Sequence, residues 1–457
     1  MTEPEKPVVR MPGGGRLLGR RQAGVAAFLG VPYARPPVGE ARFRPPEPAP
    51  PWTGDRDATA PGPIAPQPVS RLERVTGPQQ PMAQAEDCLT VNVWTPDPVS
   101  GPRPVLVFVH GGGFLTGSGG LEWYHGAELA RRGGLTVVTI NYRLGVLGFG
   151  YFAGLTDDLG EGNLGLLDVR EALRWVRANI AAFGGDQADI TVAGQSGGAL
   201  SILALLSGSS GRGLFRRAVL QSIPGGMRPW RPERATEIAT HFLRVLGVPP
   251  GRAGLLRTLP TADLLAAQEK VAREVRGGPR DFAPPFQLVA DGELVAEDPV
   301  GAVGARAADG VRILLGFTRD EAAAFLPGAE GVAELTDDMV RRPTLRLAEA
   351  LAEHGNPAWL YQFDWSPAGS PFGACHCIEL PFVFGNPHAW RNAPMLGDPV
   401  PGPPAAVTDL VQRAWIAFVR DGDPGHGGLP GWPRYSRDRR GVLRFSPSPA
   451  LGSVSEE

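Results

Sequence analysis

The chain has 457 residues, of which 42% are hydrophobic and 20% are charged, and its 45 basic and 47 acidic side chains give a net charge of −2. This composition provides enough apolar surface for a sizeable core and excludes an intrinsically disordered chain. The balanced charge provides no basic surface field, so we expect a small-molecule partner and neither nucleic acid nor an anionic membrane.

Cysteine content and the N-terminal residues bear on cellular location. The three cysteines, Cys88, Cys375 and Cys377, are an odd number far below a disulfide framework. The first residues contain no apolar signal segment, and no stretch approaches the roughly 18 apolar residues of a membrane span. We therefore expect a cytoplasmic protein. For its oligomeric state we expect a monomer or a small homo-oligomer.

Strand and helix patterns alternate along the chain. Short apolar, β-branched runs, typical of strands buried on both faces, occur at 89–94, 105–110, 135–142, 190–194, 218–222, 313–318 and 359–365. Apolar residues at helical spacing predict helices over 168–183, 198–206, 235–246, 338–353 and 405–420. For the first of these helices Asp168 is the expected N-cap. The alternation predicts an α/β fold, with a mostly parallel central sheet and helices on both of its faces.

No Ser/Gly-rich linker divides the chain, so we expect one domain over residues 1–457. Residues 223–310 and 326–357 are expected to be helical or irregular insertions that shape the substrate pocket. Fraying is expected at the two ends, near residues 1–8 and 449–457.

A glycine-rich pentapeptide at 194–198 is the first motif that indicates a catalytic residue. It reads Gly-Gln-Ser-Gly-Gly, follows a predicted strand and precedes a predicted helix. This is the context of the Gly-x-Ser-x-Gly nucleophile elbow, in which flanking glycines let the turn tighten until the serine is strained and exposed. Ser196 is therefore a candidate nucleophile.

A second glycine-rich segment lies upstream, where the predicted strand 105–109 runs into His110-Gly-Gly-Gly-Phe114. Such loops supply backbone amides to the oxyanion hole of lipases and esterases, and glycine is needed because no Cβ can stand between the amide and the oxyanion. A tight turn alone would explain either segment, but a glycine loop followed by an elbow favours a hydrolase.

With these residues in hand, the chain resembles the type-B carboxylesterases, the α/β-hydrolase family that includes bacterial p-nitrobenzyl esterases and cholinesterases. The resemblance covers nearly the whole chain. The matching segments are 28–34 (FLGVPYA), 42–43, 86–89 (EDCL), 92–94, 141–145 (NYRLG), 163–168, 183–186, 291–292, 373–376, 381–385, 432–433 and 435.

This resemblance implies a catalytic triad of Ser196, Glu321 and His376, in the chain order that hydrolases of this fold share. From the residues alone, Asp320 remains an alternative to Glu321. His388 remains a rival base, although a surface position is the more ordinary expectation for it.

The expected reaction is carboxylic ester hydrolysis through an acyl-enzyme, with the amides of Gly112, Gly113 and Gly197 as the oxyanion hole. No metal or organic cofactor is expected. Cys375 and Cys377 flank His376, but three ligands crowded into three residues cannot surround one tetrahedral zinc ion.

Two departures from the family pattern stand out. Gln195 replaces the usual Glu before the nucleophile, which should reduce electrostatic support for the imidazolium without abolishing activity. Ala65 replaces the cysteine that often pairs with the equivalent of Cys88, so Cys88 is expected to be a free, buried thiol.

The pocket segments bear on the substrate. Between residues 65 and 88 there is no aromatic side chain, whereas cholinesterases place there a Trp that binds a quaternary ammonium, so acetylcholine is a poor candidate. The segment from Glu321 to His376 is short for the family, which predicts an open gorge for short to medium acyl and aryl esters. Phe114, Trp230 and Phe382 are the candidate pocket residues.

Two alternatives stay open. The same triad would hydrolyse amides, carbamates or lactones, because pocket geometry sets leaving-group preference. A non-catalytic binding protein on this fold is the other alternative, which the presence of all three triad residues disfavours.

Overall fold

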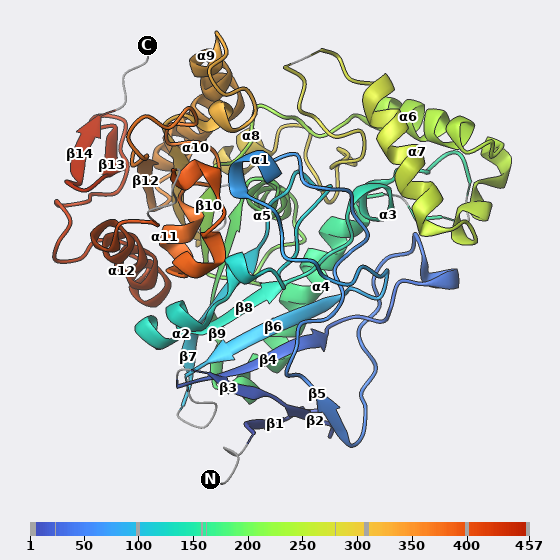
Figure 1. Cartoon of the computed structure of the whole chain (residues 1–457), viewed down its shortest axis with the longest axis horizontal. Coiled ribbons are helices and arrows are strands. Elements are labelled where there is room, and N and C mark those ends of the chain that lie inside the picture. The colour runs from blue at the N-terminus through green and yellow to red at the C-terminus, as the bar shows by residue number, and fades with distance from the viewer. Residues whose placement is uncertain are drawn as a thin grey trace.

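In the computed structural model, the described residues are 6–22, 24–96, 101–156, 159–160, 162–278, 280–305, 310–397 and 402–453. Their main feature is an eleven-stranded sheet with the order β14-β13-β12-β11-β10-β9-β7-β8-β6-β4-β3, which crosses the molecule in Figure 1. A separate three-stranded sheet, β1-β2-β5, lies near the N-terminus.

Seven neighbouring strands of the large sheet, from β8 to β13, run parallel, and the strands at both edges are antiparallel. The mostly parallel sheet predicted from the sequence is therefore observed. The strand bounds are β1 (Val8–Arg10), β2 (Arg16–Leu18), β3 (Arg20–Gln22), β4 (Val25–Pro32), β5 (Asp55–Asp57), β6 (Thr90–Thr95), β7 (Arg103–Val109), β8 (Thr136–Ile140), β9 (Gly185–Gln195), β10 (Arg217–Gln221), β11 (Arg312–Thr318), β12 (Ala358–Phe363), β13 (Gly441–Phe445) and β14 (Ala450–Ser453).

Both faces of the central strands are buried. In β7, Val105, Val107 and Val109 belong to one hydrophobic cluster, while Leu106 and Phe108 belong to another on the opposite face. Successive side chains of a strand point to opposite faces, so a continuous apolar run is what a sheet covered on both sides requires.

One face of the sheet is covered by α4 (Leu164–Asn179), α5 (Gly197–Ser207), α8 (Pro299–Ala305) and α10 (Arg342–Glu353), and the short helix α3 (Gly145–Phe149) packs against α4. The other face carries α2 (Ala127–Gly133), α11 (Leu380–Phe384) and α12 (Ala405–Asp421). Helices therefore lie on both sides, as expected.

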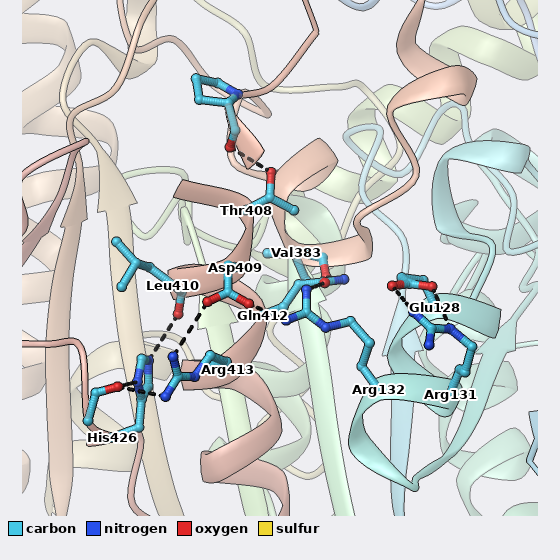
Figure 2. Close-up of polar contacts among 12 residues, drawn as sticks. Glu128, Arg131, Arg132, Val383, Thr408, Asp409, Leu410, Gln412, Arg413 and His426 are labelled. Atoms are coloured by element: carbon cyan, nitrogen blue, oxygen red, sulfur yellow. Dashed lines mark hydrogen bonds and ion pairs between the residues drawn. The ribbon is translucent and has the colours of Figure 1, made fainter. Parts of the chain in front are cut away.

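Polar contacts tie the helices of the second face together (Figure 2). Arg132 of α2 donates to the Gln412 side-chain oxygen of α12 over 2.5 Å and also contacts Asp409. The Gln412 amide in turn donates to the Val383 carbonyl of α11, 3.2 Å away. These bonds fix α11, the helix that follows His376.

The expected insertions are mainly helical where they are described. The first contains α6 (Pro232–Val245), the 3-10 segment η4 (Pro250–Arg257) and α7 (Thr261–Glu274), with α6 and α7 paired at the upper right of Figure 1. The second contains α9 (Val332–Thr336), the π-helical turn η7 (Asp337–Arg341) and α10. Residues 306–309, at the end of the first predicted insertion, lie outside the described residues.

Two sequence-based expectations need correction. Asp168 is not an N-cap: α4 begins after Asn163, and the buried Asp168 carboxylate instead pairs with Arg143 over 2.7 Å. Residues 450–453 do not fray, because β14 pairs antiparallel with β13. Of the ends predicted to fray, residues 1–5 and 454–457 lie outside the described residues.

Within the described ranges, none of the helices combines the length and the apolar character needed to cross a bilayer.

Candidate active site

The candidate residues follow the carboxyl ends of parallel strands. The glycine loop follows β7, Ser196 follows β9, Glu321 follows β11, and His376 lies in the segment after β12. Because β7, β9, β10, β11 and β12 are neighbours and parallel, these ends share one edge of the sheet. Residues separated by up to 266 positions in the chain are thereby brought to one place.

Ser196 occupies a strained turn between β9 and α5. Its backbone has φ 55° and ψ −123°, a conformation that costs about 1–3 kcal/mol for a residue with a side chain. The Ser196 amide ties this turn to β10 by donating a hydrogen bond to the Gln221 carbonyl over 2.9 Å. The serine thus lies at the N-terminus of α5, where unpaired amides and the helix dipole favour negative charge.

Close backbone contacts explain two of the glycines. A Cβ on Gly198 would lie 2.1 Å from the Val109 carbonyl oxygen, so only glycine lets α5 begin this close to β7. Gly112 has φ 109°, and a Cβ there would lie 2.0 Å from the Thr116 carbonyl oxygen. Gly198 therefore requires glycine for packing, and Gly112 requires it for both packing and backbone conformation.

The glycine loop and the elbow lie against each other. A Cβ added to Gly197 would be 3.4 Å from the backbone nitrogens of both Gly113 and Phe114. Among the described contacts, the amides of Gly113 and Gly197 donate no hydrogen bond to the protein. Amides left unpaired beside a candidate nucleophile can stabilise a developing oxyanion.

Glu321 and His376 form a buried pair. The glutamate Oε2 accepts from the imidazole Nδ1 over 2.5 Å, and its Oε1 accepts from the Thr318 amide over 2.8 Å. Asp320, the alternative acid, accepts instead from Arg319 and from the Ala374 amide. The geometry therefore pairs the imidazole with Glu321 and leaves Asp320 to hold the loop.

The surroundings of the imidazole shift its proton affinity. Burial alone lowers the pKa of His376, whereas Cys377 and the Glu321 carboxylate raise it, and the net direction is well above the ordinary value. A second buried acid, Glu379, lies three residues further on. Burial raises the pKa of Glu379 to about 7; one of its oxygens accepts from Gln221, and the other has no partner among the described residues.

Gln195 contacts the other side of the imidazole. Its side-chain amide lies 3.1 Å from His376 Nε2 and 3.4 Å from Cys377 Sγ. An amide nitrogen can only donate, so Nε2 accepts and the ring proton is on Nδ1, facing Glu321. No hydrogen bond joins Ser196 and His376 among the described contacts; Gln195 occupies Nε2 in this state.

Ser196 and His376 line one cavity, together with Gln195, Cys377 and the glycines of the oxyanion loop. The space between the atoms, counted out to the open mouth, is about 760 Å³. The wall is completed by Pro68, Val69, Ser70, Arg71, Leu72, Leu115, Thr116, Pro224, Met227, Phe282, Pro284, Phe325 and Met339. The volume open to the centres of water-sized molecules is only about 80 Å³, so the cavity is narrow, and its largely apolar wall is typical of a small-molecule site.

The three predicted pocket residues do not line this cavity. Phe114 is fully buried and packs on Phe149, and Phe382 packs on Phe363 and Trp365. Trp230 is half-buried and donates to the Pro285 carbonyl. Phe114 takes a left-handed backbone conformation, with φ 61°, and its ring belongs to the core rather than to the pocket.

Aromatic walls come instead from Phe282 and Phe325. Their rings lie 4.9 Å apart, and the Phe325 ring lies 5.6 Å from that of His376. Neither ring was predicted from the sequence, since each lies in a loop with no motif. Glu379 was also missed, although an acid three residues after the candidate histidine was a usable signal.

The remaining candidates lie apart from the cavity or form no ligand cluster. His388 is exposed on the 3-10 turn η8 (Pro387–Trp390) and lines a different surface hollow. All three cysteines are free and buried, including Cys88 as expected. Within the described part of the chain, no group of His, Cys, Asp and Glu is arranged to hold a metal ion.

Comparisons with known proteins agree with this arrangement. The family model described as "Carboxylesterase family" matches residues 5–334 and 327–456. The chain is 38% identical to the para-nitrobenzyl esterase of Bacillus subtilis and 40% identical to the phenmedipham hydrolase of Pseudarthrobacter oxydans, in each case over 94% of this chain and 93% of the relative. A solved structure of a PNB esterase, 35% identical, matches with a TM-score of 0.88 over 98% of this chain and 97% of that one.

Proposed function

Since the chain belongs to the carboxylesterase family and is a carboxylic ester hydrolase with the α/β-hydrolase fold, we propose that Ser196, Glu321 and His376 are its catalytic triad. The observation that carries the assignment is the buried Glu321–His376 pair, which opens onto the same cavity as the strained Ser196.

In the proposed acylation step, the Ser196 hydroxyl displaces the Gln195 amide from His376 Nε2 and transfers its proton there as Oγ attacks the ester carbonyl. Glu321 holds the proton on Nδ1 and stabilises the imidazolium that forms. The amides of Gly112, Gly113 and Gly197 donate to the oxyanion, and the dipole of α5 favours the same charge.

Collapse of the tetrahedral intermediate then breaks the bond to the leaving alcohol, which takes the proton from His376. Water, deprotonated by the same imidazole, releases the carboxylic acid and regenerates Ser196. These steps use the protein's own groups and need no metal or organic cofactor.

The proposed substrates are small esters with short to medium acyl or aryl groups, which suit a narrow, largely apolar cavity. The similarity to a phenmedipham hydrolase supports carbamates as a second substrate class for the same triad. We further propose that residues 1–457 act as one domain and that the enzyme works in the cytoplasm, where its three free thiols would persist.

The assignment is tested by inactivation with a serine-reactive organophosphate while hydrolysis of p-nitrophenyl butyrate is followed. We expect loss of activity at one equivalent of reagent and the phosphoryl mass on the peptide that contains Ser196. Full activity in the stoichiometrically labelled protein, or a label on another residue, would contradict the assignment.

A further inference from the structure

The cavity wall contains one guanidinium that the proposed chemistry does not use. Arg71 lies in the segment between residues 65 and 88, and its Nη2 is 3.2 Å from the position that a Cβ on Gly113 would take. Its Nη1 donates to the Phe282 carbonyl over 3.3 Å. The Arg71 residue is exposed at the mouth, but its guanidinium faces the oxyanion loop.

This guanidinium has no carboxylate partner. Among the described residues, the side-chain hydrogen bond of Arg71 is the one to the Phe282 carbonyl, and no ion pair within 4.0 Å joins it to an acid. No Asp or Glu is among the described residues that line the cavity. Asp281 is the acid whose charge acts on Arg71. Both Asp281 carboxylate oxygens already accept from backbone amides of its own loop, those of Gly277 and Ala283.

Other basic groups lie around the same mouth. Arg276 is 5.8 Å from the ring of Phe282, the residue whose carbonyl Arg71 contacts, and Arg74 donates to the Phe325 carbonyl. Burial and the charge of Arg276 both lower the pKa of Arg71. Positive charge therefore surrounds the mouth, and the Arg71 guanidinium within it faces no carboxylate of the described cavity wall, an arrangement that favours binding of an anion.

We propose that Arg71 is a specificity-determining residue that binds a carboxylate carried by the substrate, in its acyl chain or its leaving group, while the ester carbonyl lies at the oxyanion amides. This inference rests on the proposed function of Ser196 and its neighbours. A guanidinium matches a carboxylate with two parallel hydrogen bonds, and its place beside Gly113 puts that contact within one small substrate's length of the reacting carbonyl.

Two matched substrate pairs test the proposal and locate the carboxylate. For the acyl side, p-nitrophenyl hexanoate is compared with the mono-p-nitrophenyl ester of adipic acid. For the leaving-group side, 4-carbamoylphenyl butyrate is compared with 4-carboxyphenyl butyrate. The readout is the ratio of kcat/KM for the charged ester to that for its neutral partner.

In one of the two pairs we expect Arg71→Gln to lower this ratio about five- to tenfold, mainly through KM, as for one partly exposed charge-assisted contact. Arg71→Lys should restore only part of the ratio, because lysine keeps the charge but loses the paired hydrogen bonds. Raising NaCl from about 0.05 to about 0.5 M should lower the ratio in the wild type. The matched control is Arg35→Gln, an exposed arginine that pairs with Glu47 and does not line the cavity; it should leave the ratio unchanged.

Equal ratios in the wild type and in Arg71→Gln for both pairs would overturn the proposal. Hydrolysis of the neutral esters by Arg71→Gln reports that the variant is folded. The proposed function would instead be refuted if the wild type hydrolysed none of the four esters, or if a Ser196→Ala variant hydrolysed them all. Failure of the Arg71 proposal and failure of the proposed function therefore give different results.

Discussion

The edge of the sheet and the mouth of the cavity are built in different ways. At the edge, Ser196, Glu321 and His376 follow neighbouring parallel strands, and Glu321 and His376 are almost fully buried. At the mouth, Arg71, Phe282 and Phe325 come from loops and are half-buried or exposed. Hydrogen bonds between neighbouring strands fix the positions of the residues at the edge, whereas a few side-chain contacts fix those at the mouth. Chemistry is therefore expected to depend on the edge, and selectivity on the mouth.

The sharpest test of the edge is Ser196→Ala. We expect kcat for p-nitrophenyl butyrate to fall by about 10⁴-fold or more, because the remaining groups cannot form an acyl-enzyme. Thermal unfolding of the variant should show equal or higher stability, since alanine removes a polar group from a strained site. A variant with near-wild-type turnover would show that the serine is not the nucleophile.

The second test separates the two neighbouring acids. Glu321→Gln should lower kcat by about 10³–10⁴-fold, because the amide no longer holds the proton on His376 Nδ1. Asp320→Asn should cost less than about tenfold, since Asp320 contacts Arg319 and the Ala374 amide rather than the imidazole. A large loss only in Asp320→Asn would reverse the assignment.

The third test concerns pH. Only neutral His376 can accept the serine proton, so kcat/KM should fall as pH drops through the raised pKa of His376, at a pH above the ordinary histidine value of about 6.5. Gln195→Glu places a carboxylate 3 Å or so from Nε2 and should move this acid limb upward by about one unit, which lowers activity about tenfold at neutral pH.

Gln195→Met is the matched control, because it removes the amide without adding charge. Its acid limb should stay much closer to that of the wild type than the limb of Gln195→Glu. An identical limb in all three proteins would mean that the group titrating in the profile is not His376.

The smallest effect is expected at the mouth. Phe282→Ala should raise KM for neutral aryl esters by a few-fold and leave kcat nearly unchanged, because it removes a half-buried wall contact. Phe382→Ala is the contrasting variant: its ring is fully buried outside the cavity, so it should lower the free energy of unfolding by about 3–5 kcal/mol. If Phe382→Ala changed only KM, that result would indicate that Phe382 lines the pocket.

Local patterns in the chain were sufficient to predict most of the central architecture. All seven strand runs from 89 to 365 coincide with β6 to β12, because a strand buried on both faces needs an unbroken apolar run that is legible from neighbouring residues alone. The glycine spacing around Ser196 was equally legible, since close backbone contacts leave glycine no substitute. Strands β1 to β5, β13 and β14 were not predicted, and neither was helix α7. Most of these strands have only three to five residues, too few to show a periodicity.

The sequence by itself therefore determined the parallel core and the elbow. The three residues of the candidate triad were expected from family resemblance, and the residues alone left Asp320 open as the acid. Tertiary structure alone decided that Glu321 rather than Asp320 meets the imidazole, that Gln195 occupies Nε2, and that Phe282 and Phe325 line the pocket in place of Phe114 and Phe382. For residues of the same type, neighbouring sequence does not show in which direction each side chain points. Which one faces the cavity depends on how distant segments pack against it.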